Sequence, residues 1–254
     1  MTSFPFAAFM ADQYRVHQPG DRRTEEWYRG LLRPAATRDT DGGLALAAER
    51  QGDLIGFRSA LWLDGSGDHW SYGGSFGDLL LKRDGEESAR STYPYDAFKV
   101  PAEDSAYELT QNLSKIDTSD RNWLRSTALT TTWSFRSRLE PDVYSRGVPI
   151  FFPAYDLPVD GVNTLPARGG IKVGLSAEGH AGYTPGTITE ASLSYSYDGG
   201  TTWTRAPTEQ RAGTWTATLD HTGATGKQVM LRATLTDSNS NSVTQTITRA
   251  YDVR

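Results

Sequence analysis

The sequence contains no cysteine and only three methionines among its 254 residues. The absence of cysteine excludes structural disulfides and thiolate chemistry. No apolar run approaches the ~20 residues that a membrane-spanning helix needs, so we expect no membrane partner. An excess of basic residues is also absent, because 26 Lys and Arg stand against 31 Asp and Glu and give a net charge of −5. This mild acidity, spread along the chain, argues against a nucleic-acid partner.

The amino terminus does not match the pattern of a secretory signal peptide. Residues 1–10 contain no basic residue, and their short apolar run is interrupted by Pro5. A signal peptide combines a basic segment, an apolar segment and a cleavage site of small residues. We therefore expect the chain to carry no signal peptide of its own.

The abundant residues favour strands and turns. Seven Trp and twelve Tyr accompany 25 Gly, and aromatic and β-branched residues are enriched in strands. Residues 193–203, LSYSYDGGTTW, alternate up to Tyr197, break at Asp198-Gly199-Gly200 and then resume with β-forming residues. This pattern predicts a tight β-hairpin. It also resembles the Asp-box hairpin that recurs once per blade in sialidase-like propellers. Here it occurs once, which argues against a propeller.

Similar runs at roughly ten-residue spacing predict an all-β chain with two β-sandwich domains. Residues 1–140 are predicted to form a jelly-roll-like domain, and residues 141–254 an immunoglobulin-like or fibronectin-III-like one. The first ~35 residues define no clear element, although residues 21–32 could form two helical turns or a late-pairing strand. Residues 64–77 are predicted to form a long loop. The expected strands span residues 44–50, 54–63, 78–83, 95–100, 107–113, 126–137, 149–157, 171–176, 188–196, 201–205, 214–219, 229–237 and 242–251.

One catalytic motif occurs in the chain. Residues 73–77, GGSFG, match the G-x-S-x-G nucleophile elbow with Ser75 at its centre. The elbow needs a strand before the serine and a helix after it, whereas a glycine-rich loop and a strand are predicted here. We therefore interpret the match as chance, and a hydrolase that uses Ser75 ranks lowest among the possible functions.

The histidines and acidic loops give no metal-binding pattern. The four histidines, His17, His69, His180 and His221, show no paired ligand spacing, and we expect each in a solvated loop. The loop Asp64–Asp68 lacks the glycine and glutamate positions of an EF-hand, although calcium binding there stays open. We expect no catalytic residue, no metal and no cofactor.

Four aromatic residues are candidates for a ligand-binding surface: Trp62, Trp70, Tyr72 and Trp203. Exposed rings of this kind could contact a sugar or a protein. In a β-rich chain such rings more often fill the core or form cross-strand pairs, so both interpretations stay open.

Several stretches together are similar to one family. In order they are Tyr95–Ala102 with Tyr107–Leu109, Thr131–Ser137, Tyr155–Pro158, Leu193–Trp203, Gly213–Thr218 and Val229–Tyr251. Their order and spacing resemble the C-terminal, non-catalytic region of large secreted bacterial subtilisin-like serine peptidases. The resemblance covers roughly residues 25–254 and is specific in the last sixty residues.

The resemblance implies a role without catalysis in this chain. The subtilase triad lies in D-[ST]-G, H-G-T and G-T-S strings, and none of these occurs in the sequence. The parent would be an extracellular serine endopeptidase whose catalytic domain lies outside this polypeptide. We expect a monomeric accessory module that stabilises the catalytic domain in cis or binds its protein substrate. The alternative is a carbohydrate- or cell-surface-binding β-sandwich module, motivated by the aromatic-rich segment 69–76.

Overall fold

The computed structural model describes residues 10–13, 17–71, 75–115 and 124–254. No helix occurs in these ranges, and antiparallel strands form several sheets. The prediction of an all-β fold is confirmed, and the sheets pack as a β-sandwich. No segment of the described chain is a helix long and apolar enough to cross a membrane.

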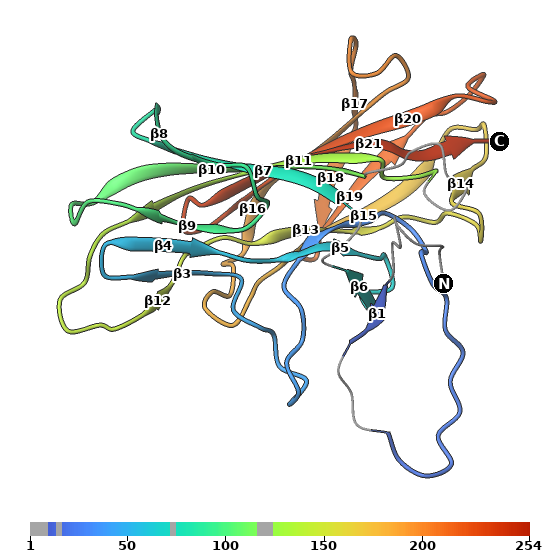
Figure 1. The fold of residues 1–254 in the computed structure, drawn as a ribbon. Helices are drawn as coiled ribbons and strands as arrows, with labels where there is room; N and C mark the ends of the chain where they lie inside the picture. Colours follow the sequence, from blue (N-terminus) through green and yellow to red (C-terminus); the bar gives the residue numbers. More distant parts are fainter. Residues whose placement is uncertain (1–9, 14–16, 72–74, 116–123) are drawn as a thin grey trace.

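The largest sheet has nine strands and forms one layer of the sandwich (Figure 1). Its order is β17-β16-β20-β21-β11-β10-β7-β8, and β14 pairs with β21. Its strands are β7 (Ser75–Arg83), β8 (Glu86–Ser91), β10 (Ser105–Lys115), β11 (Ala128–Ser137), β14 (Thr164–Leu165), β16 (Ile188–Ser196), β17 (Thr204–Ala206), β20 (Gln228–Asp237) and β21 (Ser242–Val253).

Three four-stranded sheets lie on the other side (Figure 1). The first is β1 (Ala11–Asp12), β6 (His69–Ser71), β5 (Ala60–Leu63) and β2 (Arg33–Ala35), in that order. The second is β12 (Arg146–Gly147), β3 (Ala48–Gln51), β4 (Leu54–Phe57) and β9 (Asp96–Lys99). The third is β13 (Phe152–Asp156), β15 (Ile171–Glu178), β19 (Thr214–Leu219) and β18 (Thr208–Arg211).

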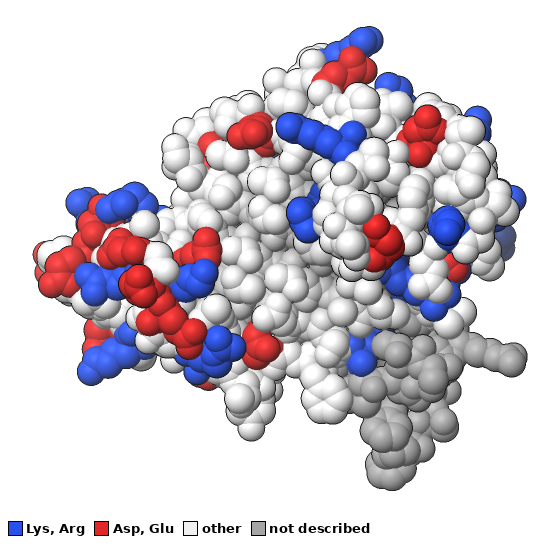
Figure 2. All heavy atoms as spheres, turned by 90° about the horizontal axis from the view of Figure 1, so that it is seen from above, with Lys and Arg blue, Asp and Glu red and all other residues white. Residues whose placement is uncertain are grey.

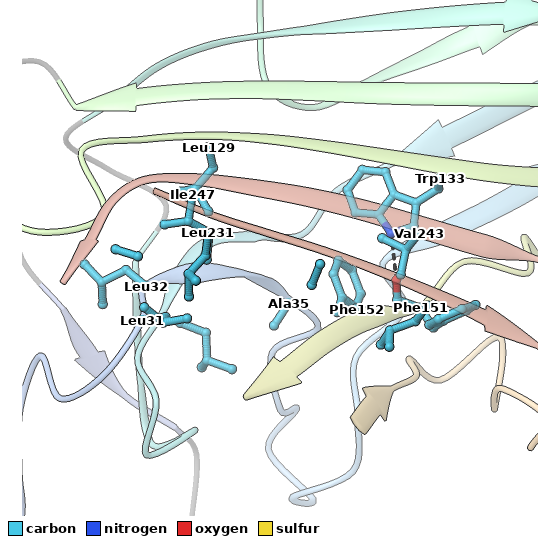
Figure 3. Close-up of a cluster of buried hydrophobic side chains, with 14 of the residues drawn as sticks. Leu31, Leu32, Ala35, Leu129, Trp133, Phe151, Phe152, Leu231, Val243 and Ile247 are labelled. Atoms are coloured by element: carbon cyan, nitrogen blue, oxygen red, sulfur yellow. Dashed lines mark hydrogen bonds between the residues drawn. The ribbon is translucent and has the colours of Figure 1, made fainter. Parts of the chain in front are cut away.

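The core forms because alternate side chains of the long strands point inward. Along β10 every second residue is buried. Trp133 on β11 is fully buried and packs against Phe57 at 5.0 Å and Phe152 at 5.6 Å between ring centroids. Its indole N–H donates a hydrogen bond to the carbonyl oxygen of Phe151 at 2.7 Å (Figure 3). Leu129 on the same strand is also buried, and β20 and β21 supply Leu231, Val243 and Ile247.

Strands from both sides of residue 140 share this sheet and this core. Strand β11 pairs with β21 from Ala128↔Thr248 to Ser134↔Ser242. The predicted domain boundary lies between β11 and β12. The division into two domains at residue 140 stays a prediction.

The hairpin at residues 193–203 is confirmed. Strands β16 and β17 pair antiparallel up to Tyr195↔Thr204. Gly199 and Gly200 adopt φ values of 69° and 88°, which glycine accepts without steric cost. The Asp198 carboxylate accepts hydrogen bonds from the Thr202 hydroxyl at 2.6 Å and the Thr202 amide at 2.9 Å. These bonds lower the pKa of Asp198 to about 2.

Three expectations about segments were wrong. Residues 21–32 form a loop with turns, and neither helical turns nor a strand. The expected strand 54–63 is two strands in different sheets, β4 and β5. Side chains are alternately buried along β4 and are all buried along β5. The chain therefore passes from one sheet to another within a single apolar run. The expected loop 64–77 contains β6, because His69 and Ser71 are buried.

Candidate functional site

A hollow that is less open to solvent than the surface grooves lies where the end of β11, strand β12 and the loop 179–184 meet. We call it the arginine cavity, and its volume is about 380 Å³. The lining residues are Arg50, Gly52, Asp104, Arg136, Ser137, Arg138, Leu139, Glu140, Val143, Arg146, Gly147, Pro149, Gly182 and Tyr183. Four arginines therefore face two carboxylates.

Arg50 is the most deeply placed of these cations. It lies on β3 and is 5% exposed. Its guanidinium donates to the carbonyls of Gly52 at 3.0 Å and Pro101 at 2.5 Å, and to the Ser137 hydroxyl at 3.2 Å. All three acceptors are neutral. Burying a cation is costly unless an anion is paired with it, and no carboxylate of the described residues pairs with Arg50 in the cavity.

The other three arginines differ in their partners. Arg136 contacts Asp104 through two nitrogens at 3.1 and 2.8 Å, and this hydrogen bonding raises the pKa of Arg136. Arg146 forms an ion pair with Glu140. Arg138 is exposed and pairs with no described carboxylate. Arg50 and Arg138 together account for the excess positive charge.

The cavity wall depends on two glycines that pack backbone against backbone. A Cβ at Gly147 would clash with the carbonyl oxygen of Gly182. Only glycine allows β12 and the loop 179–184 to approach so closely. A side chain at Gly147 would therefore push apart the two segments that shape the wall.

His180 fixes the same loop from the buried side. Its Nε2 donates to the Val148 carbonyl at 3.0 Å, and its Nδ1 accepts from the amides of Gly182 at 3.1 Å and Ala47 at 3.4 Å. This set requires the neutral imidazole with its proton on Nε2. Burial lowers the pKa of His180, which keeps the ring neutral.

Tyr183 forms the wall opposite the arginines. Its hydroxyl donates to the Asp237 carboxylate and accepts from the amides of Asn239 at 3.0 Å and Asn241 at 2.8 Å. These bonds tie the cavity wall to the β20–β21 turn. Burial and the hydrogen bond to Asp237 raise the pKa of Tyr183, so its ring contributes a neutral, partly apolar surface.

An exposed apolar rim adjoins the cavity. Leu139 and Val143 line it and are partly exposed, and Tyr144 between β11 and β12 is 85% exposed. Tyrosine and arginine are the residues most enriched where proteins bind other proteins. The arrangement therefore suits a ligand that combines a negative group with an apolar portion.

The three predicted surface aromatics that the structure describes do not come together in one site. Trp62 is 0% exposed and packs in the core. Trp70 is partly buried against that core. Trp203 stacks on Arg232, with the guanidinium carbon 3.9 Å from the ring centroid, and donates to the Gly200 carbonyl at 2.9 Å. Tyr72 lies outside the described residues.

The expectation that every histidine is solvated was wrong for three of the four. His69, His180 and His221 are buried, whereas His17 is exposed. Polar neighbours in the sequence suggested loops, but ring hydrogen bonds to partners far along the chain make burial possible. His221, for example, contacts Tyr251 at 2.8 Å through Nε2.

The acidic loop Asp64–Asp68 uses its carboxylates internally. Asp64 accepts from Ser66 at 2.5 Å and contacts His69 Nδ1 at 2.8 Å, and Asp68 pairs with Arg23. Within the described ranges, no group of three or more histidines and carboxylates could hold a metal ion.

Ser75 begins β7, so a strand follows it where a nucleophile elbow needs a helix. Residues 73 and 74 of the motif lie outside the described residues. The sequence pattern therefore offers no support for a serine nucleophile at this position.

The arginine cavity was not found from the sequence. Arg50 and Arg146 are separated by many residues, and only strand pairing brings them opposite each other. The one available signal was the density of arginines around the proposed boundary, at Arg136, Arg138 and Arg146. Neither a protein-family model nor any curated protein matches the chain.

Proposed function

We propose that this chain is a non-catalytic accessory module that holds a protein chain by a carboxylate group in the arginine cavity. The observation that carries the proposal is the pair of guanidinium groups, on Arg50 and Arg138, that no described carboxylate neutralises. A bound carboxylate would supply the missing charge through charge-assisted hydrogen bonds. The exposed rim at Leu139, Val143 and Tyr144 would contact the side chains beside it.

The resemblance to C-terminal regions of secreted subtilisin-like peptidases supports the biological setting. The stretches that carry it form strands β9, β10, β11, β13, β16, β19, β20 and β21 with their turns. In that setting the module would be extracellular. The protein chain held in the cavity would be the peptidase's substrate or a segment of its catalytic domain.

Binding of two labelled peptides tests the proposal by fluorescence anisotropy. Both are amidated at the C terminus and share one sequence, with Leu-Glu in the first and Leu-Gln in the second. The Leu-Glu peptide should bind at least about tenfold more tightly, because a hydrogen bond to a charged group contributes roughly 1.5–3 kcal/mol. Equal affinity for the two peptides would overturn the proposal.

Variants locate the binding site. Arg138→Gln should weaken binding of the Leu-Glu peptide by about tenfold. Arg211→Gln is the matched control, because Arg211 is 81% exposed on β18 and pairs with Glu209. Unchanged affinity in Arg138→Gln, or equal losses in both variants, would exclude the cavity as the site.

The non-catalytic part has its own test. The purified chain is treated with a fluorophosphonate probe for serine hydrolases and assayed for casein cleavage. We expect neither labelling nor cleavage. Labelling that Ser75→Ala abolishes would overturn this part of the proposal.

A further inference from the structure

The outer face of the nine-stranded sheet carries hydroxyl groups in register. One row crosses four adjacent strands through Thr110, Thr132, Thr244 and Thr234. Hydroxyls along this row bond to each other, at 2.9 Å between Thr110 and Thr132 and at 3.0 Å between Thr234 and Thr244. Figure 2 shows charged side chains densest at one end of this side of the molecule and scattered over the other end, with a largely uncharged area between them.

A groove lies in this face near the end of the β10–β11 pair. We call it the Phe76 groove, and its volume is about 420 Å³. Its lining residues are Phe76, Gly77, Asp78, Thr92, Asn112, Leu113, Ser114, Ala128, Leu129 and Thr130. No lysine or arginine is among them, so the groove differs in charge from the arginine cavity.

The groove combines one bare aromatic ring with a polar network. Phe76 is 64% exposed, which leaves most of its ring open to a ligand. Asn112 donates to the Asp78 carboxylate at 2.8 Å and accepts from the Thr130 hydroxyl at 2.9 Å. These two bonds fix the Asn112 amide and leave it one further proton, and they leave acceptor positions on Asp78 and Thr130.

We propose that the Phe76 groove binds a neutral polysaccharide. A sugar ring has a C–H face that packs on an aromatic ring and hydroxyl groups that need both donors and acceptors. Phe76 supplies the aromatic ring for the C–H face of the sugar. The hydrogen-bond donors and acceptors for its hydroxyl groups come from Asp78, Asn112 and Thr130. An acidic ligand would meet the Asp78 carboxylate, and no lysine or arginine lines the groove to bind it. A protein partner would need a larger apolar patch than one exposed ring.

The site is distinct from the arginine cavity and goes beyond the proposed function. Residues 136–138, at the carboxyl end of β11, line the arginine cavity. Residues 128–130, at the amino end of the same strand, line the Phe76 groove. Either site can therefore fail its test while the other passes.

Affinity electrophoresis of the whole chain tests the proposal. Native gels contain galactomannan, arabinoxylan or mixed-linkage β-glucan, with alginate as an anionic control. We expect retardation in at least one neutral polymer. Phe76→Ala should weaken that binding by about tenfold, the upper end of one aromatic contact. Thr130→Val, which keeps the shape and removes the hydroxyl, should weaken it severalfold.

The control variant is Val162→Ala, which truncates a 70% exposed side chain outside the groove and should leave retardation unchanged. Equal thermal unfolding midpoints would show that the variants are folded. Unchanged migration in all three neutral polymers would overturn the proposal. So would retardation in alginate alone, or retardation that neither Phe76→Ala nor Thr130→Val reduces.

Discussion

Lowering the pH from 7 to 4 should destabilise the protein through His221. This ring is fully buried, and its Nδ1 lies 2.6 Å from the Tyr197 hydroxyl and its Nε2 2.8 Å from the Tyr251 hydroxyl. Burial lowers the pKa of His221 to about 4 from its ordinary value of 6.5. Burial also raises the pKa of Tyr197 to about 12 and that of Tyr251 well above its usual range, so both tyrosines stay neutral.

The direction and size of the effect follow from proton binding. Between pH 6.5 and 4 the unfolded chain protonates His221 while the folded chain does not, so the free energy of unfolding falls as the pH falls. The contribution of neutral His221 to the free energy of unfolding is fully present above pH 6.5, the pKa of the ring in the unfolded chain. It is lost as the pH falls to about 4, the pKa of the ring in the folded chain. The difference of about 2.5 pKa units corresponds to roughly 3 kcal/mol.

Urea unfolding followed by tryptophan fluorescence measures this contribution at pH 7, 5.5 and 4. The comparison variant is His221→Gln, which keeps an amide near Tyr251 but does not titrate. A carboxylate whose pKa is lowered by other neighbours, such as Asp198 beside Thr202 and Ser196, titrates in both proteins and cancels in the difference. The stability advantage of the native protein over His221→Gln should shrink by about 3 kcal/mol between pH 7 and 4.

A stability difference that stays constant within about 1 kcal/mol over this range would refute the reasoning. An NMR titration of His221 in the native protein gives an independent check, including the case in which His221→Gln does not fold. A measured pKa near 6.5 would show that the buried ring is not penalised when charged.

Three further predictions concern packing and buried polar groups. Gly147→Ala should lower the melting temperature and weaken peptide binding, because its Cβ would clash with the Gly182 carbonyl. Gly161→Ala, where nothing lies within 4 Å, should change neither. Asp64→Ala should cost about 3 kcal/mol in urea unfolding, since it removes the buried partner of His69. The exposed Asp53→Ala serves as its control, and equal losses would contradict the buried pair. Trp133→Phe should cost about 1–3 kcal/mol, because the buried Phe151 carbonyl loses its donor. A loss below about 0.5 kcal/mol would mean that water replaces the indole.

The features of the fold that the sequence predicted are local. The hairpin at residues 193–203 was predicted from its own alternation and its glycine pair, and β16 and β17 pair antiparallel up to Tyr195↔Thr204. The expected strands 229–237 and 242–251 likewise correspond to β20 and β21. In these cases the pattern that specifies the structure lies within about ten residues, so no distant contact is needed to interpret it.

The parts that the sequence did not predict depend on long-range pairing. The run from Leu54 to Leu63 has one composition, but β4 pairs with β3 and β9 while β5 pairs with β6 and β2. Two of the buried histidines, His180 and His221, have ring hydrogen-bond partners that are about 30 positions away in the sequence. The arginine cavity is of the same kind, because Arg50 reaches Ser137 across 87 positions. Such juxtapositions are set by strand order, which local periodicity does not encode.

The β10–β11 pair connects the two proposed sites and gives a last prediction. The two strands pair without interruption from Ser105↔Ser137 to Ser114↔Ala128. The arginine cavity lies at one end of this pair and the Phe76 groove at the other. Six residues separate Thr130 from Arg136, which corresponds to roughly 20 Å along a strand.

Binding at the two sites should therefore be independent. A fully hydrogen-bonded strand pair within a nine-stranded sheet has no second arrangement that either ligand could favour, and coupling between sites requires one. The Leu-Glu peptide should bind with the same affinity, within about twofold, with or without a saturating neutral polysaccharide. A larger change in affinity would mean that the ligands compete for one site or that the strand pair moves. Repeating the titration with Phe76→Ala separates these outcomes, because only a polysaccharide effect that acts through the groove disappears in that variant.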